Sequence, residues 1–259
     1  EYAALARRRS IRMQINIELD VGLHRGGAAS EKDLLAILEV IQSEPLLSFS
    51  GMMGYEAHVV KVPGDPLELH AEAMAIYQQR LDEASRALGS EMPAKLTLNA
   101  GGSPTYQLYD DGVYPCNELA AGSCLVKPRD FDLATLSDHD AATFIATQVL
   151  KVAAQAEIPG VDALGDVMSL WDPNLQQAFF TYGGYWKAVP ESPKGLVVNP
   201  VYGRSTNQEM LNGSNSVQLK VNDWVFLRPS QSEWVFLQFG DIALLEGEEI
   251  LTRWPVFSA

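Results

Sequence analysis

The sequence predicts an α/β fold followed by a mostly antiparallel β domain, and three observations support this. Before residue 130, short apolar runs alternate with amphipathic stretches, as expected for parallel strands joined by right-handed helical crossovers. After residue 135, short β-rich segments are separated by turn residues such as Asn212-Gly213 and Glu246-Gly247, which is typical of antiparallel sheets. Glycine-rich or polar loops follow the predicted parallel strands, at whose carboxyl ends ligands bind in such folds.

The first half begins with a helix that ends in Arg7-Arg8-Arg9, whose positive charges suit a helix C-terminus. A strand over 13–20 follows, and a glycine-rich loop with Arg25 comes after it. The run Ser30-Glu31-Lys32-Asp33 caps the next helix. The apolar residues that recur with a helical period predict its buried face: Leu34, Leu35, Ile37, Leu38 and Ile41.

The next strand, over 49–55, leads into Glu56-Ala57-His58, and residues 66–88 predict a long amphipathic helix. A third strand over 95–99 enters the loop Asn99–Thr105. A short helix and a fourth strand around 118–126 complete this part.

The second half predicts strands rather than helices. Its boundary lies near Asp138-His139-Asp140, which divides the chain into residues 1–137 and 138–259. The predicted strands cover 143–152, 178–187, 217–229, 233–245 and 250–257.

The composition indicates a soluble globular protein. The 259 residues are 47% hydrophobic, enough for one large core or two smaller ones. The formal net charge of −14 is spread along the chain and argues against a nucleic acid or an anionic membrane as partner. No apolar run approaches the roughly 18 residues that span a bilayer, and a signal-peptide pattern is absent. With Cys116 and Cys124 as its two cysteines, we expect a cytoplasmic protein.

The loop Asn99–Thr105 is the strongest candidate binding site. Gly101 and Gly102 let the backbone turn sharply and expose N–H groups, and Ser103 and Thr105 add hydroxyl donors. Backbone amides in a concave loop form an anion-binding nest. An ordinary strand-to-helix turn is the alternative interpretation of this stretch by itself.

The order of four motifs resembles that of the D-threonine aldolase/D-serine dehydratase-like family. The motifs are Glu18–Gly26, Gly51–His58, Gly101–Thr105 and Glu118–Ser123. The family comprises pyridoxal-phosphate enzymes with an alanine-racemase-like barrel and a C-terminal β domain, and the resemblance runs along essentially the whole chain. It implies the cofactor pyridoxal 5'-phosphate, a small amino-acid substrate and a homodimer.

The resemblance assigns roles to individual residues. Arg25 matches an arginine that faces the pyridine nitrogen of the cofactor and keeps it unprotonated. Tyr55 matches a tyrosine beside the cofactor, and His58 lies where it could contact the substrate or relay a proton, so both are catalytic candidates. The phosphate would lie between two loops, with Gly101, Gly102, Ser103 and Thr105 on one side and Gly122, Ser123 and Cys124 on the other. The family often has tyrosine in place of Cys124, which we interpret as a packing residue.

Two departures from the family concern the lysine and the metal. Four β/α units are half of an eight-stranded barrel, so we expect the C-terminal half of a TIM-type barrel, cut from a longer chain. The family's Schiff-base lysine lies on the first barrel strand, upstream of Glu1, and Lys61 and Lys127 lie in loops that the family does not use for it. Gln231 and Glu233 stand where relatives place metal ligands, which makes a divalent metal doubtful.

If Gln231 and Glu233 face the pocket, they could instead contact a polar group of the substrate, and a solvent-facing turn is the alternative. The polar run Arg204–Glu209 is a second candidate for lining the same cleft, or an ordinary loop.

The leading hypothesis is therefore a pyridoxal-phosphate lyase for a β-hydroxy D-amino acid, acting by dehydration and deamination or by aldol cleavage. The absent metal pair favours the dehydratase. The alternatives are an amino-acid racemase on the same scaffold and a non-catalytic protein that binds the cofactor or an amino acid.

Overall fold

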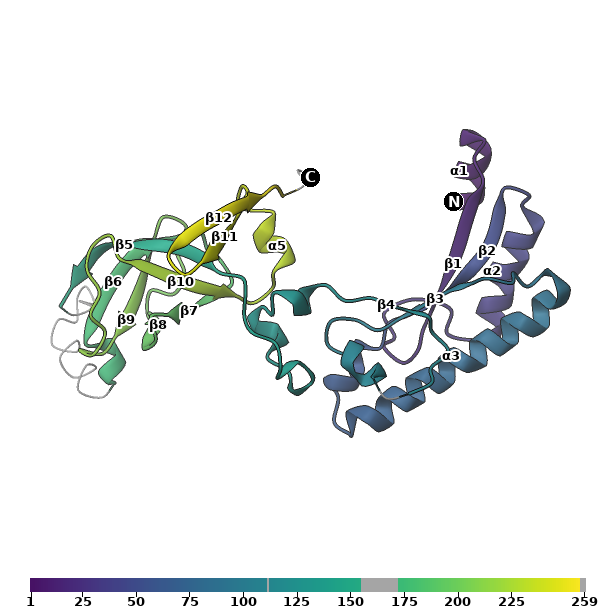
Figure 1. Cartoon of the computed structure of the whole chain (residues 1–259), viewed down its shortest axis with the longest axis horizontal. Helices are drawn as coiled ribbons and strands as arrows, with labels where there is room; N and C mark the ends of the chain where they lie inside the picture. Colours follow the sequence, from purple (N-terminus) through teal and green to yellow (C-terminus); the bar gives the residue numbers. More distant parts are fainter. Residues whose placement is uncertain (111, 155–171, 257–259) are drawn as a thin grey trace. The chain divides into compact units, whose positions relative to one another are not determined.

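The computed structural model describes residues 1–110, 112–154 and 172–256 (Figure 1). Contacts divide the chain into two compact units, each with its own hydrophobic core. The first unit comprises Glu1–Cys124 and Leu133–Asp138, and the second comprises Leu125–Asp132 and His139–Ala259. Among the described residues, no helix is both long and apolar enough to cross a membrane.

The first unit is a parallel sheet with helices, as the α/β prediction requires. Its four strands pair in the order β1-β2-β3-β4, and every pair is parallel. The strands are β1 (Met13–Leu19), β2 (Leu47–Gly54), β3 (Thr97–Ala100) and β4 (Glu118–Leu119). The helices are α1 (Tyr2–Arg9), α2 (Glu31–Ser43) and α3 (Pro66–Leu88).

Local signals set the limits of α2 and α3. Ser30 and Asp33 form a capping box, in which each side chain accepts a hydrogen bond from the other's backbone N–H, at 3.2 and 3.1 Å. The Asp65 side chain caps α3, Pro66 is its first residue, and Gly89 with a φ of 51° ends it. Both helices therefore begin where the sequence predicts.

The predicted buried face of α2 is too wide. Leu34, Leu38 and Ile41 are buried, whereas Leu35 and Ile37 are 38% and 37% exposed. Residues four and seven positions apart share one stripe of a helix, and the two exposed residues lie beside that stripe rather than on it.

The last part of the first sheet also differs from the prediction. The expected short helix is a 3-10 turn over Tyr106–Tyr109, and the fourth strand covers only Glu118–Leu119. The chain then turns, and Ser123–Leu125 forms another 3-10 turn. The Ser103 side chain, from the loop after β3, holds this turn by accepting a hydrogen bond from the Cys124 N–H. Because the two residues are far apart in the sequence, a local pattern does not reveal the interaction.

The second unit is antiparallel, as predicted. Six strands pair in the order β7-β10-β5-β6-β9-β8, and a separate hairpin joins β11 and β12. The strands are β5 (Ile145–Ala153), β6 (Gln177–Tyr182), β7 (Ala188–Ser192), β8 (Leu196–Val198), β9 (Gln208–Gly213), β10 (Trp224–Pro229), β11 (Ile242–Glu246) and β12 (Glu249–Trp254).

Several predicted strands of this unit are too long. Residues 233–236 form the short helix α5 (Glu233–Phe236) instead of a strand, because a helical turn lets Val235 enter the core beside Trp234. The strand predicted from residue 217 begins only at Trp224, since Asn222 has a φ of 75° and Asp223 accepts a turn hydrogen bond from Lys220. Strands β7, β8 and β9 were not predicted, and Phe257 lies outside the described residues.

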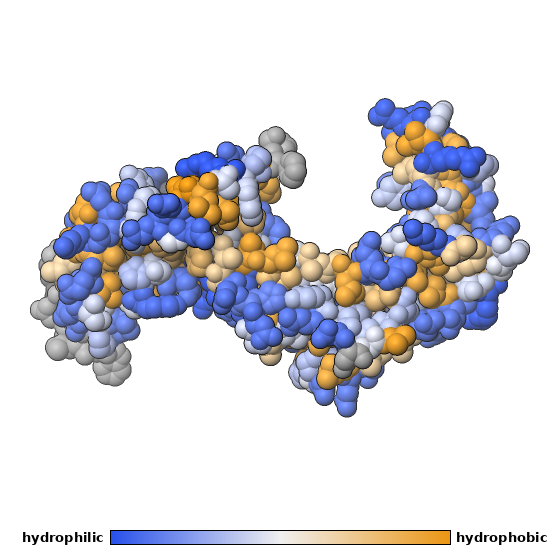
Figure 2. All heavy atoms as spheres, viewed as in Figure 1, coloured by the Kyte–Doolittle hydropathy of each residue, from blue (hydrophilic) through white to orange (hydrophobic). Residues whose placement is uncertain are grey.

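The β11–β12 hairpin carries exposed apolar side chains, which gather over it in Figure 2. All six residues of β12 are exposed. Leu245, Ile250, Leu251 and Trp254 are each more than half exposed, so the hairpin contributes little to the core of its unit.

Candidate functional site

Three loops of the first unit meet in a stack of Arg25, Tyr55 and Gly102. The guanidinium carbon of Arg25 lies 4.8 Å from the centre of the Tyr55 ring, which allows a cation–π contact. A Cβ atom on Gly102 would lie 2.2 Å from Cε2 of the same ring. Only glycine therefore fits beneath Tyr55. The residues follow β1, β2 and β3, so the structure brings together three loops that the sequence places at successive strand ends.

The loop that carries Arg25 is organised by Asp20. One carboxylate oxygen of Asp20 accepts hydrogen bonds from the N–H groups of Gly22 and His24, at 3.0 and 2.9 Å. The other oxygen lies 2.8 Å from Nδ1 of His24. Burial by itself raises the pKa of Asp20, but these hydrogen bonds outweigh it and leave the pKa lowered.

His58 packs against the same loop. A Cβ atom on Gly22, whose φ is 113°, would lie 2.8 Å from Nε2 of His58, so the close approach requires glycine. Nδ1 of His58 is buried and has no hydrogen-bond partner within the described part of the chain. The close approach to Gly22 thus positions the imidazole and this buried nitrogen.

Glu56 lies under the Gly101–Thr105 loop with no exposed surface. Its carboxylate accepts a hydrogen bond of 2.5 Å from the Thr105 hydroxyl and one of 3.3 Å from the Gly101 N–H. Burial, and then the negative charge of Glu56, raise the pKa of Tyr109 far above its ordinary value. Two of the donors predicted to face a phosphate, Gly101 and Thr105, therefore point to Glu56.

Ser103 joins the two predicted phosphate loops. Its hydroxyl oxygen accepts hydrogen bonds from the N–H groups of Gly122 and Cys124, at 3.0 and 3.1 Å. Ser103, Ser123 and Cys124 are all buried. The side chain of Ser103 thus holds the loop after β4 against the loop after β3, although 19 residues separate Ser103 from Gly122.

The donors that remain near this junction fit an anion. No acceptor among the described residues pairs with the N–H groups of Gly102 and Ser103. Nothing lies within 4 Å of the position that a Cβ atom of Gly122 would occupy, so space opens beside this glycine. Adjacent backbone N–H groups without a protein acceptor can form an anion-binding nest, which makes this junction the candidate site for a phosphate group.

Gln231 and Glu233 belong to the second unit. Nε2 of Gln231 donates a hydrogen bond of 2.7 Å to Asp130, and Glu233 is exposed at the start of α5. Within the described residues, no group of three or more His, Cys, Asp or Glu side chains could hold a metal ion.

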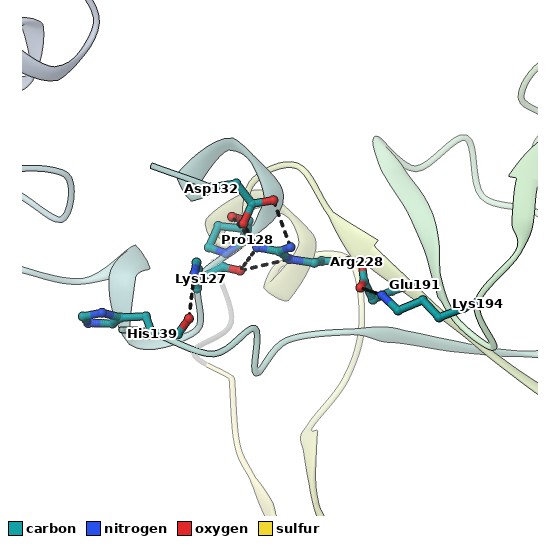
Figure 3. A network of polar contacts seen from close by, with 7 residues as sticks. All are labelled: Lys127, Pro128, Asp132, His139, Glu191, Lys194 and Arg228. Atoms are coloured by element: carbon teal, nitrogen blue, oxygen red, sulfur yellow. Dashed lines mark hydrogen bonds and ion pairs between the residues drawn. The ribbon is translucent and has the colours of Figure 1, made fainter. Parts of the chain in front are cut away.

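A polar network in the second unit holds residues 127–132 against β10 (Figure 3). Arg228 donates hydrogen bonds to both carboxylate oxygens of Asp132, at 3.0 and 2.6 Å, and to the carbonyl oxygen of Lys127, at 2.9 Å. The Lys127 ammonium donates to the carbonyl of His139, at 2.6 Å. Lys127 is thus part of this network.

Sequence reasoning missed Glu56 and Asp20 as organising residues. Both are acids near the carboxyl end of a strand, Asp20 directly after β1 and Glu56 two residues after β2, and both stand inside motifs that the sequence analysis assigns to other residues. An acid at the carboxyl end of a buried parallel strand is the signal that could have identified them.

Residues 1–130 match the family model described as alanine racemase, N-terminal domain. Curated proteins give no significant match. Solved structures with the same fold include a D-threonine aldolase from Filomicrobium marinum, with 15% identity and a TM-score of 0.72 over 98% of this chain and 65% of that one.

A D-threo-3-hydroxyaspartate dehydratase from Delftia sp. HT23 shares 14% identity, with a TM-score of 0.70 over 100% of this chain and 69% of that one. An alanine racemase from Clostridium difficile 630 shares 14% identity, with a TM-score of 0.59 over 91% of this chain and 59% of that one. This chain therefore spans roughly two thirds of the length of these proteins or less, and the likeness shows the fold.

Proposed function

The chain belongs to the alanine racemase N-terminal domain family, and from this premise we propose that it is part of a pyridoxal-phosphate-dependent lyase that acts on a β-hydroxy D-amino acid. The observation that carries the proposal is the convergence of Arg25, Tyr55 and Gly102 beside the loops joined by Ser103. It provides a cation, an aromatic ring and an anion nest at the carboxyl end of one parallel sheet, where ligands bind in such folds.

The nest would hold the phosphate through the N–H groups of Gly102 and Ser103. Arg25 would face the pyridine nitrogen from above Tyr55. Because a guanidinium does not give up its proton near neutral pH, a nitrogen that accepts a hydrogen bond from Arg25 stays unprotonated. When bound, the cofactor supplies an electron-withdrawing system that stabilises negative charge next to the amino group of the substrate.

His58 would move the proton. Its Nδ1 is the buried ring nitrogen without a partner among described residues, and an imidazole nitrogen can either donate or accept a proton. A protonated Nδ1 can give its proton to a departing β-hydroxyl group, and a neutral one can accept a proton from that hydroxyl. The first event leads to dehydration and the second to aldol cleavage, so the residue serves either lyase reaction.

The fold comparisons favour a lyase over a racemase. The likeness to the aldolase and the dehydratase has TM-scores of 0.72 and 0.70, against 0.59 for the alanine racemase. A racemase on the same scaffold remains the second candidate, and a homodimer remains a prediction of the resemblance. Gln231 and Glu233 stay predicted substrate or metal contacts.

Product analysis of the full-length protein tests the function. Loaded with pyridoxal phosphate and given D-serine, D-threonine or D-threo-3-hydroxyaspartate, a dehydratase releases ammonia and a keto acid. An aldolase releases glycine and an aldehyde from D-threonine, and a racemase yields the L-amino acid. Borohydride reduction followed by peptide mass analysis locates the lysine that carries the cofactor. Reversible cofactor binding with no product and no reducible adduct would overturn the enzyme proposal.

A further inference from the structure

A cavity of about 820 Å³ lies in the second unit, on the outer face of its large sheet. Its floor is formed by residues of β5, β6 and β9, which are adjacent strands of the sheet (Figure 1). Lys151 is paired with Phe180, and Phe180 with Met210, so the three side chains share one face. The alternate residues Phe179 and Leu211 are completely buried on the core face. The cavity is thus separated from the hydrophobic core by the sheet itself.

Buried amides hold the wall of this cavity, residues 202–205, in place. Asn199 is 3% exposed, and its side-chain oxygen accepts hydrogen bonds from the N–H groups of Val201 and Tyr202, at 2.9 and 2.8 Å. Its Nδ2 donates to Oδ1 of the fully buried Asn212, at 2.7 Å. The carbonyl of Ser205 accepts from the N–H groups of Gly184 and Tyr185, both at 3.0 Å. A wall with this many internal partners is shaped before any ligand arrives.

Two cations line the cavity. Arg204 forms an ion pair through one terminal nitrogen with Glu209, which is 1% exposed. Burial raises the pKa of Glu209, although Arg204 opposes the effect. The Lys151 ammonium lies 5.0 Å from the centre of the Phe180 ring, and no carboxylate among the described residues forms an ion pair with it. Since Glu209 offsets the charge of Arg204, the lining retains a charge of about +1.

We propose that this cavity binds a small monocarboxylate with a flat apolar body. A carboxylate can accept hydrogen bonds from the remaining N–H groups of Arg204 and lie beside the Lys151 ammonium. The apolar body would lie on the floor formed by Phe180 and Met210, next to Tyr202. A monoanion matches the net charge of the lining better than a phosphate dianion does. All of its lining residues belong to the second unit, so the proposal does not depend on the proposed lyase reaction.

Phenylacetate is a suitable probe, with phenylacetamide, acetate and inorganic phosphate as comparisons. Saturation-transfer NMR and isothermal titration of the full-length protein should show binding of phenylacetate, with much weaker binding of the uncharged amide and of acetate, which lacks the ring. The Lys151→Gln variant should weaken phenylacetate binding about fivefold, because a cation at a partly exposed site contributes about 1 kcal/mol. Lys151 is exposed, so this variant should fold normally.

Lys220→Gln is the matched control, because Lys220 is an exposed lysine of the same unit outside the cavity lining. It should leave phenylacetate binding unchanged. The proposal is overturned if phenylacetate does not bind, if Lys151→Gln and Lys220→Gln behave alike, or if inorganic phosphate competes as strongly as phenylacetate does. Cofactor binding measured on both variants should be unchanged, which separates this result from any failure of the proposed function.

Discussion

Glu56 accepts a 2.5 Å hydrogen bond from the hydroxyl of Thr105, and its carboxylate is completely buried beneath the loop that Thr105 ends. The same carboxylate accepts from Gly101 at the beginning of that loop. One side chain from the end of β2 therefore holds both ends of the loop after β3. The conformation of the loop whose Gly102 and Ser103 N–H groups we propose as the phosphate site depends on this acid.

Replacing Glu56 by Gln should destabilise the protein and weaken cofactor binding. The amide oxygen of glutamine can accept from the Gly101 N–H while its NH₂ group donates to the Thr105 hydroxyl, but neither contact then keeps the charged acceptor that strengthens it. Hydrogen bonds to charged groups contribute about 1.5–3 kcal/mol, so the free energy of unfolding should fall by about 2 kcal/mol in urea titrations. The dissociation constant of pyridoxal phosphate, measured by absorbance, should rise.

The matched control is Glu118→Gln, because the exposed Glu118 accepts a single 2.8 Å hydrogen bond from Asn99. Its free energy of unfolding should change by about 0.5 kcal/mol or less. Equal effects of the two variants would contradict the role assigned to Glu56.

Replacing Ser103 by Ala should release the loop after β4. The N–H groups of Gly122 and Cys124 would lose their shared acceptor, and a buried donor without a partner costs about 1–3 kcal/mol. Hydrogen exchange of these two amides should become faster, with little change in α2. Ser43→Ala is the control, since the Ser43 hydroxyl donates only within its own helix and is exposed. Unchanged exchange at Gly122 would show that Ser103 does not hold the loop.

Replacing Arg228 by Lys should destabilise the second unit. Arg228 is 8% exposed and its planar guanidinium reaches both oxygens of Asp132 and two carbonyl groups, which an ammonium cannot do. Because the Asp132 side chain is 51% exposed, solvent screening reduces the loss to about 1–2 kcal/mol. Thermal unfolding of the variant and the wild type measures this loss in the free energy of unfolding.

Lys194→Gln provides the comparison for Arg228→Lys. The ion pair between the exposed Lys194 and the partly exposed Glu191 (Figure 3) should contribute about 0.5 kcal/mol or less. If Lys194→Gln lowers the free energy of unfolding as much as Arg228→Lys does, the hydrogen bonds of Arg228 are not the cause of the destabilisation.

Asp20 should make the stability of the first unit depend on pH. Its folded-state pKa lies below the ordinary value of 3.8, so the unfolded chain binds the proton more readily. The contribution is therefore complete above pH 3.8 and is lost as the pH falls through the folded-state pKa. Urea titrations at several pH values below about 5 should show that the free energy of unfolding decreases less with falling pH for Asp20→Asn than for the wild type. An identical decrease would mean that other groups cause the acid sensitivity.

The sequence by itself determined the features that depend on neighbouring residues. The limits of α3, the capping box of Ser30 and Asp33, and the parallel arrangement of the first sheet follow from local hydrogen bonds and from helical and strand periods. The resemblance to a family of pyridoxal-phosphate enzymes also rested on local motifs in a fixed order, and the family match over residues 1–130 confirms the fold that it implied.

Only the tertiary structure decided the features that join distant residues. Glu56 meets Thr105 across 49 positions, and Ser103 meets Gly122 across 19. The exposure of Leu35 and the helical turn at Val235 likewise depend on what packs against them. Hydrophobic period and capping act within a few residues, whereas the partner of a polar side chain is chosen by the packing of the whole unit. The sequence could therefore indicate candidate ligand-binding loops, but not which of their donors are already paired within the protein.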